Sequence, residues 1–193
     1  MSVQASARRE PEAIDLPAST IAEAARLIES RELSPVDLTE ALLRRIEIFD
    51  PQLSAYITLT ADLALEQARQ AEKEIAAGRY RGPLHGIPIG LKDLYYTRGI
   101  LTSGHSKIGL DHVPAFDATT TAKLRDAGAV LLGKLATHEF AHGGPSFDLP
   151  WPPARNPWNT AHFTGGSSSG SAAAIAARMA LGTLGTDTGG SIR

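Results

Sequence analysis

The stretch from Asp117 to Leu132, DATTTAKLRDAGAVLL, decides the class of fold, because a helix pattern in it passes directly into a strand pattern. Residues 117–127 are predicted to form a helix. Gly128 is placed to end it, since glycine readily adopts the left-handed conformation common after helices. The apolar residues 129–132 predict a buried strand. Because strands and helices alternate along this part of the chain, we predict an α/β sheet with helices on its faces.

The chain before residue 80 is predicted to be mainly helical. Thr20-Ile21-Ala22-Glu23 matches a capping box and predicts a helix that ends near Ser30. A second helix is expected to start at Ser34-Pro35, with the serine as N-cap, and to end near Phe49 because Asp50-Pro51 follows. Two further elements are expected before Gly78: a strand at 55–59 and a helix at 61–77.

Composition changes at Arg79-Tyr80-Arg81-Gly82-Pro83, where we place a boundary. Three parts are therefore expected: a polar tail at 1–15, a helical segment at 16–80 and an α/β core at 81–193. The remaining elements expected in the core are strands at 87–91 and 181–184, helices at 134–142 and 171–180, and a proline-rich loop at 149–157.

Composition excludes several classes of protein. The 193 residues are 42% apolar and 21% charged with a net charge of −2, so nothing favours binding to nucleic acid or to an anionic membrane. The absence of cysteine excludes disulfides, thiolate catalysis and cysteine-ligated metals. No apolar stretch approaches the ~20 residues that span a bilayer, and residues 1–15 lack the apolar region of a secretory signal. A cytoplasmic enzyme is therefore expected.

Two clusters place serines directly after paired glycines. They are Gly165-Gly166-Ser167-Ser168-Ser169-Gly170-Ser171 and Thr188-Gly189-Gly190-Ser191. Glycine pairs cost backbone entropy and usually mark a special backbone conformation or the close approach of a ligand. Successive amide groups before a serine can also point at one developing oxyanion. This pattern indicates a serine hydrolase.

A serine hydroxyl needs a base to become a nucleophile, and histidine and lysine are the candidates. Gly189-Gly190-Ser191-Ile192-Arg193 lacks the second glycine of the G-x-S-x-G elbow that usually accompanies a histidine base. Lys92 follows the apolar run from Gly86 to Leu91, where burial could keep its amine uncharged. Lowering its pKa by about 3 units from 10.4 would cost ~4 kcal/mol, which only a buried site can supply.

Several segments together resemble the amidase signature family, from about residue 18 to the end of the chain. They are Gly86–Asp93, Asp117–Thr120, Gly128–Lys134, Arg155–Trp158, Gly165–Ala172 and Leu184–Arg193, in the family's order and spacing. The resemblance implies a three-layer α/β/α fold with a mixed sheet, preceded by the helical segment. It also implies that the core is truncated at its carboxyl end, since family members run to more than twice this length.

The resemblance further implies a Ser–cis-Ser–Lys triad in which Lys92 is the base, Ser167 the cis-serine that relays the proton, and Ser191 the nucleophile. No metal or organic cofactor is expected. The backbone amides that would form the oxyanion hole are those of Thr188, Gly189, Gly190 and Ser191. Supporting roles are expected for Ser168, Ser169, Asp187 and Arg193.

Three functions remain open within the family. The first is a stand-alone amidase that hydrolyses a linear carboxamide, which Leu94 and the loop at 147–153 favour. The second is the glutaminase-type A subunit of a tRNA-dependent amidotransferase, which typically has asparagine where this chain has Leu94. The third is an inactive fragment of an amidase. A homodimer is one assembly to expect, and an A subunit would instead have partner subunits.

Two other motifs carry alternative interpretations. His138-Glu139-Phe140-Ala141-His142 spells H-E-x-x-H, which on a helix can bind zinc, but Gly143-Gly144-Pro145 follows at once. No later glutamate is present, which leaves His162 as the candidate for a third ligand. The cluster at 165–171 could bind phosphate before a helix, but neither nucleotide-binding glycine motif is present.

Overall fold

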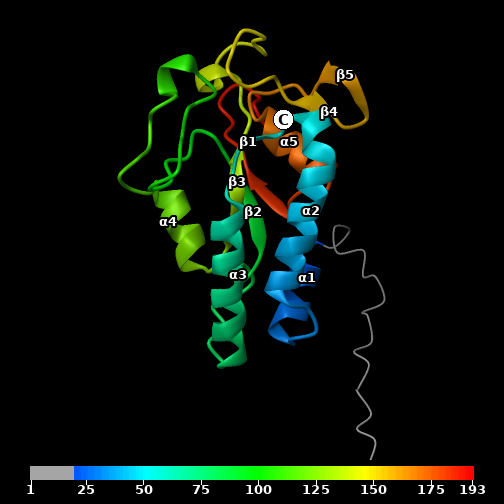
Figure 1. Ribbon diagram of the computed structural model, residues 1–193, viewed down its shortest axis with the longest axis vertical. Coiled ribbons are helices and arrows are strands. Elements are labelled where there is room, and N and C mark those ends of the chain that lie inside the picture. The colour runs from blue at the N-terminus through cyan, green and yellow to red at the C-terminus, as the bar shows by residue number, and fades with distance from the viewer. Residues whose placement is uncertain (1–19) are drawn as a thin grey trace, which may run out of the picture.

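A mixed four-stranded sheet forms the centre of the molecule. The computed structural model describes residues 20–193, so the tail expected at 1–15 lies outside the described residues. The strand order is β1 (Tyr56–Leu59), β3 (Val130–Leu135), β2 (Pro88–Lys92) and β6 (Gly182–Leu184). β2 runs parallel to both neighbours, whereas β1 is antiparallel to β3. The predicted α/β class with a mixed sheet is confirmed (Figure 1).

Five α-helices surround this sheet in the described part of the chain. They are α1 (Ile21–Glu29), α2 (Pro35–Leu53), α3 (Ala61–Ala76), α4 (Thr119–Asp126) and α5 (Ser169–Ala176). The capping box predicted at Thr20 and Glu23 is present. The Ser34 side chain caps α2 by accepting hydrogen bonds from the backbone amides of Val36 and Asp37. None of the described helices is both long and apolar enough to cross a membrane.

Helices cover the sheet on both faces. All five residues of β2 are buried, as expected for a central strand packed from both sides. Ile89 and Leu91 point to the face where α3 and α4 lie, while Lys92 points to the opposite face and reaches the segment that begins α5. In Figure 1, α4 lies to the left of the strands and α1, α2 and α5 to their right.

Two predicted helices differ from the structure: one is longer than predicted and the other does not form. The helix α2 continues through Pro51 to Leu53, although Pro51 has no N–H to donate to the preceding turn. The predicted helix at 134–142 does not form. Instead β3 runs to Leu135, since pairing with β1 and β2 on both sides outweighs the local helix pattern, and only a 3₁₀ turn at Glu139–Ala141 follows.

The predicted proline-rich loop is also more structured than expected. It leads into a two-stranded antiparallel hairpin of β4 (Arg155–Asn156) and β5 (Asn159–Phe163). A short 3₁₀ helix at Lys107–Gly109 lies in the long connection between β2 and α4. The hairpin is too short and too polar for an alternating apolar pattern to reveal it.

Gly170 sets the approach of α5 to the sheet. Its amide donates to the carbonyl of Ala136, and a Cβ at this position would lie 2.4 Å from the amide nitrogen of Ala136. We therefore expect Gly170→Ala, in the complete protein, to lower the free energy of unfolding by about 1–3 kcal/mol through overpacking. Thermal melts measure this, with Gly144→Ala as the control because nothing lies within 4 Å of a Cβ there. Equal melting temperatures for both variants would contradict the prediction.

Candidate active site

The amine of Lys92 is the centre of the candidate site. Lys92 ends β2 and is fully buried. Its Nζ lies 2.6 Å from Ser167 Oγ, 2.8 Å from Thr186 Oγ1 and 3.1 Å from Ser168 Oγ. All three partners are neutral hydroxyls, and a hydroxyl can both donate and accept, so they can solvate the amine in either protonation state.

Burial lowers the pKa of Lys92 to about 8, and the charge of Asp187 opposes this shift. Removing an ammonium from water without a hydrogen-bonded carboxylate disfavours its charged form. With that pKa, about a tenth of these amines is uncharged at pH 7 and about half at pH 8. An uncharged amine can accept a proton, which is what a general base must do.

Ser167 contacts the lysine and lies between Gly166 and Ser168 in the chain, both of which line the open groove. The peptide bond from Gly166 to Ser167 is cis, as the family resemblance implied. The carbonyl of Ser167 accepts the amide of His138 at 3.1 Å, and the serine is buried. Gly166 is packed so closely that a Cβ would lie 2.4 Å from His138 Nε2, which explains why a glycine stands there.

Ser191 lies close to this pair without completing a hydrogen-bonded chain. Its carbonyl accepts the amide of Ser168 at 3.2 Å. It lines a groove of about 560 Å³ together with Gly165, Gly166 and Ser168. Among the described residues no hydrogen bond joins the Ser191 hydroxyl to Ser167 or to Lys92. The structure thus brings Lys92 and Ser167 into contact and places Ser191 in the adjoining groove.

Asp187 closes the loop that carries Ser191. Its carboxylate accepts hydrogen bonds from the backbone amides of Gly190, Ile192 and Arg193, at 2.9–3.3 Å. It also accepts hydrogen bonds from two nitrogens of the Arg193 guanidinium, at 2.8 and 3.0 Å. These hydrogen bonds, the Arg193 side chain first, hold the pKa of Asp187 well below its usual range. The carboxylate therefore remains charged and keeps the loop closed at neutral pH.

The amides expected to form the oxyanion hole are not equivalent. The amide of Gly190 is already donated to Asp187. Those of Thr188, Gly189 and Ser191 donate to no residue in the described part of the chain. Three of the four predicted donors are therefore free to bind an oxyanion.

Ser168 contacts the lysine, whereas Ser169 does not. Ser168 Oγ also donates to the carbonyl of Thr186 and accepts its amide, so it joins the start of α5 to the end of β6. Ser169 begins α5, and its carbonyl accepts the hydroxyl of Thr164. Sequence reasoning missed Thr186. Thr186 carries no distinguishing signal in the sequence: the parallel pairing of β2 and β6 brings the residues after each strand to one edge of the sheet.

The H-E-x-x-H motif does not have the geometry of a zinc site. Phe140 has φ 47°, and the segment at 139–141 is a 3₁₀ turn, so His138 and His142 are not neighbours on one α-helical face. His138 is buried with Nδ1 2.9 Å from the carbonyl of Gly143, and Glu139 accepts the hydroxyl of Ser106. Within residues 20–193 no group of three histidine or carboxylate side chains could hold a metal ion.

Comparison with known proteins decides the family. The family model described as Amidase matches residues 37–193. The chain belongs to the amidase family. It is 53% identical over 174 residues to the A subunit of the glutamyl-tRNA(Gln) amidotransferase of Geobacter metallireducens, a match that covers 90% of this chain and 36% of that protein.

Structures of other amidase family members share the fold. A fatty acid amide hydrolase superposes with a TM-score of 0.89 at 29% identity, covering 95% of this chain and 32% of that one. The peptide amidase from Stenotrophomonas maltophilia gives a TM-score of 0.78 at 39% identity, covering 84% and 35%. The chain thus spans about a third of the length of the amidase family proteins it matches.

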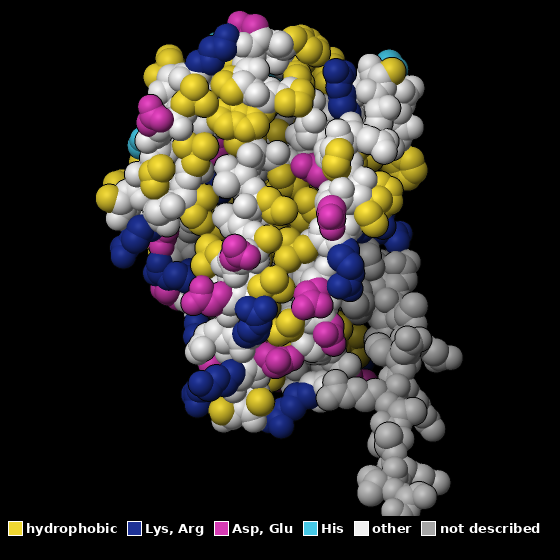
Figure 2. Space-filling view, in the orientation of Figure 1, with side chains coloured by type: hydrophobic (Ala, Val, Ile, Leu, Met, Phe, Trp, Pro, Cys, Tyr) yellow, Lys and Arg dark blue, Asp and Glu magenta, His cyan; other side chains and the backbone are white. Residues whose placement is uncertain are grey.

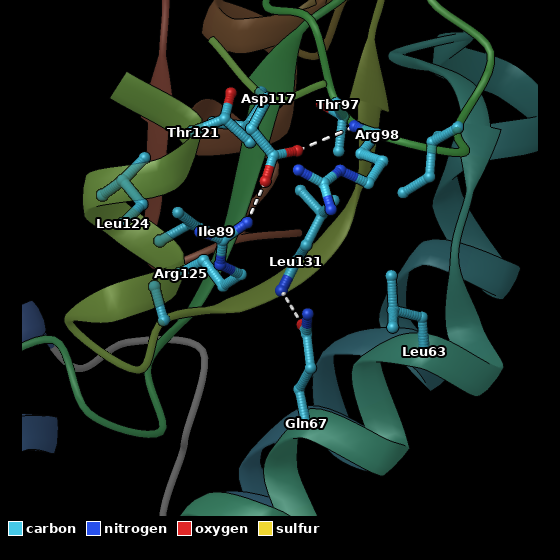
Figure 3. A pocket seen from close by; sticks show the side chains of 13 residues that line it. Leu63, Gln67, Ile89, Thr97, Arg98, Asp117, Thr121, Leu124, Arg125 and Leu131 are labelled. Atoms are coloured by element: carbon cyan, nitrogen blue, oxygen red, sulfur yellow. Dashed lines mark hydrogen bonds and ion pairs between the residues drawn. The ribbon is translucent and has the colours of Figure 1, made fainter. Parts of the chain in front are cut away.

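A second hollow of about 240 Å³ lies apart from the amidase site (Figure 3). Its floor is apolar and its rim carries charged side chains of the loop and helix beside it. The lining side chains labelled in Figure 3 include Leu63, Gln67, Ile89, Thr121, Leu124 and Leu131, with Arg98, Asp117 and Arg125. Figure 2 likewise shows apolar side chains along the middle of this side of the molecule. Because Ile89 points opposite to Lys92, this hollow takes no part in the candidate site.

Proposed function

We propose that the complete protein, of which this chain covers a part, cleaves the C–N bond of a linear carboxamide through an acyl-serine intermediate. In this proposal Lys92 is the base, Ser167 relays the proton and Ser191 is the nucleophile. The main support for this proposal is the buried contact of 2.6 Å between Lys92 Nζ and Ser167 Oγ. The hydrogen-bond partners of the amine are hydroxyls and include no carboxylate, and Ser191 lines the adjoining groove. Because the amine is uncharged in part near neutral pH, it can take a proton from a hydroxyl.

The proton follows the chain of hydroxyls. Ser191 gives its proton to Ser167 as its oxygen attacks the amide carbonyl, while Ser167 gives its own proton to Lys92. The tetrahedral oxyanion is held by the amides of Thr188, Gly189 and Ser191. Ser167 then gives a proton to the leaving nitrogen and takes one back from Lys92, and the C–N bond breaks to release the amine or ammonia. A water molecule gives a proton through Ser167 to Lys92 as its oxygen attacks the acyl-serine. The C–O bond to Ser191 then breaks, the proton returns through Ser167 to the Ser191 oxygen, and the acid leaves.

The position of Ser191 requires a movement in this mechanism. Its hydroxyl must come within hydrogen-bond reach of Ser167 when an amide occupies the groove. Asp187 and Arg193 support the loop so that the amides of Thr188 and Gly189 keep their direction during this movement. Preorganised donors of this kind cost little reorganisation in the transition state.

The relatives favour glutamine as the amide and other subunits as partners. Curated proteins with 48–54% identity to this chain include A subunits of glutamyl-tRNA(Gln) amidotransferases. Within our proposal, the side-chain amide of glutamine is therefore the first substrate, and the ammonia passes to a partner subunit. This reverses the preference for a stand-alone hydrolase that the loop at 147–153 suggested.

One observation keeps the stand-alone hydrolase as a second candidate. Leu94 occupies the position where the amidotransferase proteins typically carry asparagine, and its side chain packs toward Gly104 instead of offering an amide. An apolar side chain there would suit a substrate with an apolar acyl or amine group. Peptide and fatty acid amide hydrolases share the fold.

A substrate panel distinguishes the two candidates. The complete protein is assayed for ammonia release from glutamine, asparagine, a fatty acid amide and an aryl amide, alone and with aminoacylated tRNA and partner subunits. We expect glutamine to be the best substrate and its turnover to rise at least about tenfold with the partners. Rapid hydrolysis of the apolar amides by the protein alone, with glutamine unreactive, would instead support the hydrolase. No release from any amide would contradict the proposed function.

A further inference from the structure

A second lysine is as deeply buried as Lys92 and lies one strand away. Lys134 of β3 is fully buried and pairs in register with Leu91 of β2, the residue before Lys92. Its Nζ donates to the Tyr95 carbonyl at 2.8 Å and to Thr102 Oγ1 at 2.6 Å, and it lies 3.4 Å from Asp93 Oδ1. The proposed reaction does not use this lysine.

Asp93 follows Lys92 directly, and its carboxylate is fully buried too. One oxygen, Oδ2, accepts the amide and the hydroxyl of Ser103 at 2.9 and 2.6 Å. The other oxygen, Oδ1, accepts no hydrogen bond from the described residues and faces the Lys134 amine. The ammonium of Lys134 is therefore the group that balances this charge.

The two buried lysines have opposite surroundings. The Lys92 amine forms hydrogen bonds to hydroxyls, whereas the Lys134 amine lies beside the carboxylate of Asp93. We propose that Lys134 is a positioning residue that neutralises Asp93 and thereby allows the neighbouring amine of Lys92 to remain uncharged. The inference rests on the proposed function, in which Lys92 is the base.

The physical reason is the weak screening of charge inside the protein. Asp93 directly follows the last residue of β2 and contacts Ser103 and Lys134, whereas the Lys92 amine contacts Ser167 and Thr186. In a low-dielectric interior an unbalanced carboxylate on the neighbouring residue favours the charged form of an amine. The charge of Asp187 acts on Lys92. Burial lowers the pKa of Lys134 to about 8 and Asp93 opposes this shift, so Lys134 is mostly charged at pH 7, where the effect of its loss is measured.

The test measures kcat/KM against pH in the complete protein. In Lys134→Met we expect the acidic limb of the profile to move up by about one pH unit, which is a tenfold loss of rate at pH 7 that recovers near pH 10. In the double variant Asp93→Asn with Lys134→Met the limb returns to its original pH, because neither charge remains. In Asp93→Asn alone, we expect the acidic limb of the profile to stay at its original pH or to move to lower pH.

Different outcomes contradict the inference and the function separately. A loss of rate in Lys134→Met that is equal at all pH values, or an upward shift that persists in the double variant, overturns the role of Lys134. An upward shift in Asp93→Asn also overturns it. Lys134→Gln replaces the methionine variant if that one does not fold, with the same expected shift. If Ser191→Ala keeps turnover, the proposed function itself fails, whatever the profile of the Lys134 variants.

Discussion

Replacing Ser191 with alanine in the complete protein is expected to reduce amide turnover by about 10³- to 10⁶-fold. The reason is that the acyl intermediate forms on this oxygen, and the remaining groups can only bind the amide and polarise its carbonyl. Ser191 lines the groove and its hydroxyl makes no hydrogen bond to the described residues, so its loss leaves no buried partner unsatisfied. Ammonia release at saturating amide measures the effect.

Two further measurements make the Ser191 result specific. Mass spectrometry with a serine-directed fluorophosphonate should detect an adduct on the unmodified protein and none on the alanine variant. Ser30→Ala, at an exposed helix end, is the matched control and should keep full activity. If the Ser191 variant retained more than about a tenth of the activity, another nucleophile would have to be sought.

Replacing Lys92 with methionine is expected to lower kcat by about 10²- to 10⁴-fold, the usual contribution of a general base. Methionine is similar in length to lysine and suits a fully buried position, so the variant should fold. In the unmodified protein the active form has an uncharged amine. Its rate should therefore rise with pH, about tenfold per unit below the pKa of about 8, and level off above it.

The pH profile distinguishes a base from a residue that only supports the structure, because loss of structural support would not remove the rise of the rate near pH 8. The methionine variant should lose the rise near pH 8 along with its rate, and added small primary amines should restore some activity to the smaller Lys92→Ala variant. Lys73→Met, on the exposed face of α3, serves as the control and should leave both rate and profile unchanged. A profile that still rises near pH 8 without Lys92 would contradict its role as the base.

Local signals in the sequence were enough to locate most elements and the segments that the structure brings together at the candidate site. The capping box at Thr20 and the Ser34-Pro35 start appear where predicted, because these caps are formed by residues two or three apart. Lys92 and Ser167 are 75 residues apart, yet both were identified, since one ends an apolar strand and the other follows a glycine pair. The family match at 37–193 agrees with the motifs that indicated it.

Long-range pairing decided the parts that were mispredicted. Residues 134–135 have a pattern that suits a helix, but they lie between β1 and β2 and complete a three-strand ladder. Thr186 carried no distinguishing signal until the parallel pairing of β2 and β6 brought it to Lys92. The preference for an amidotransferase over a stand-alone hydrolase depended on relatives, because the residues that choose a substrate are few and carry no periodic pattern.

The sequence by itself determined that the chain is an α/β protein of the amidase family, because alternating strand and helix patterns and the family's glycine–serine motifs are expressed in residue types and short spacings. Only the tertiary structure decided that the Lys92 amine is fully buried and contacts three hydroxyls. It also decided that the next residue, Asp93, is paired with Lys134. Burial and electrostatic balance depend on which distant segments pack together, and that is a property of the folded chain rather than of any segment in it.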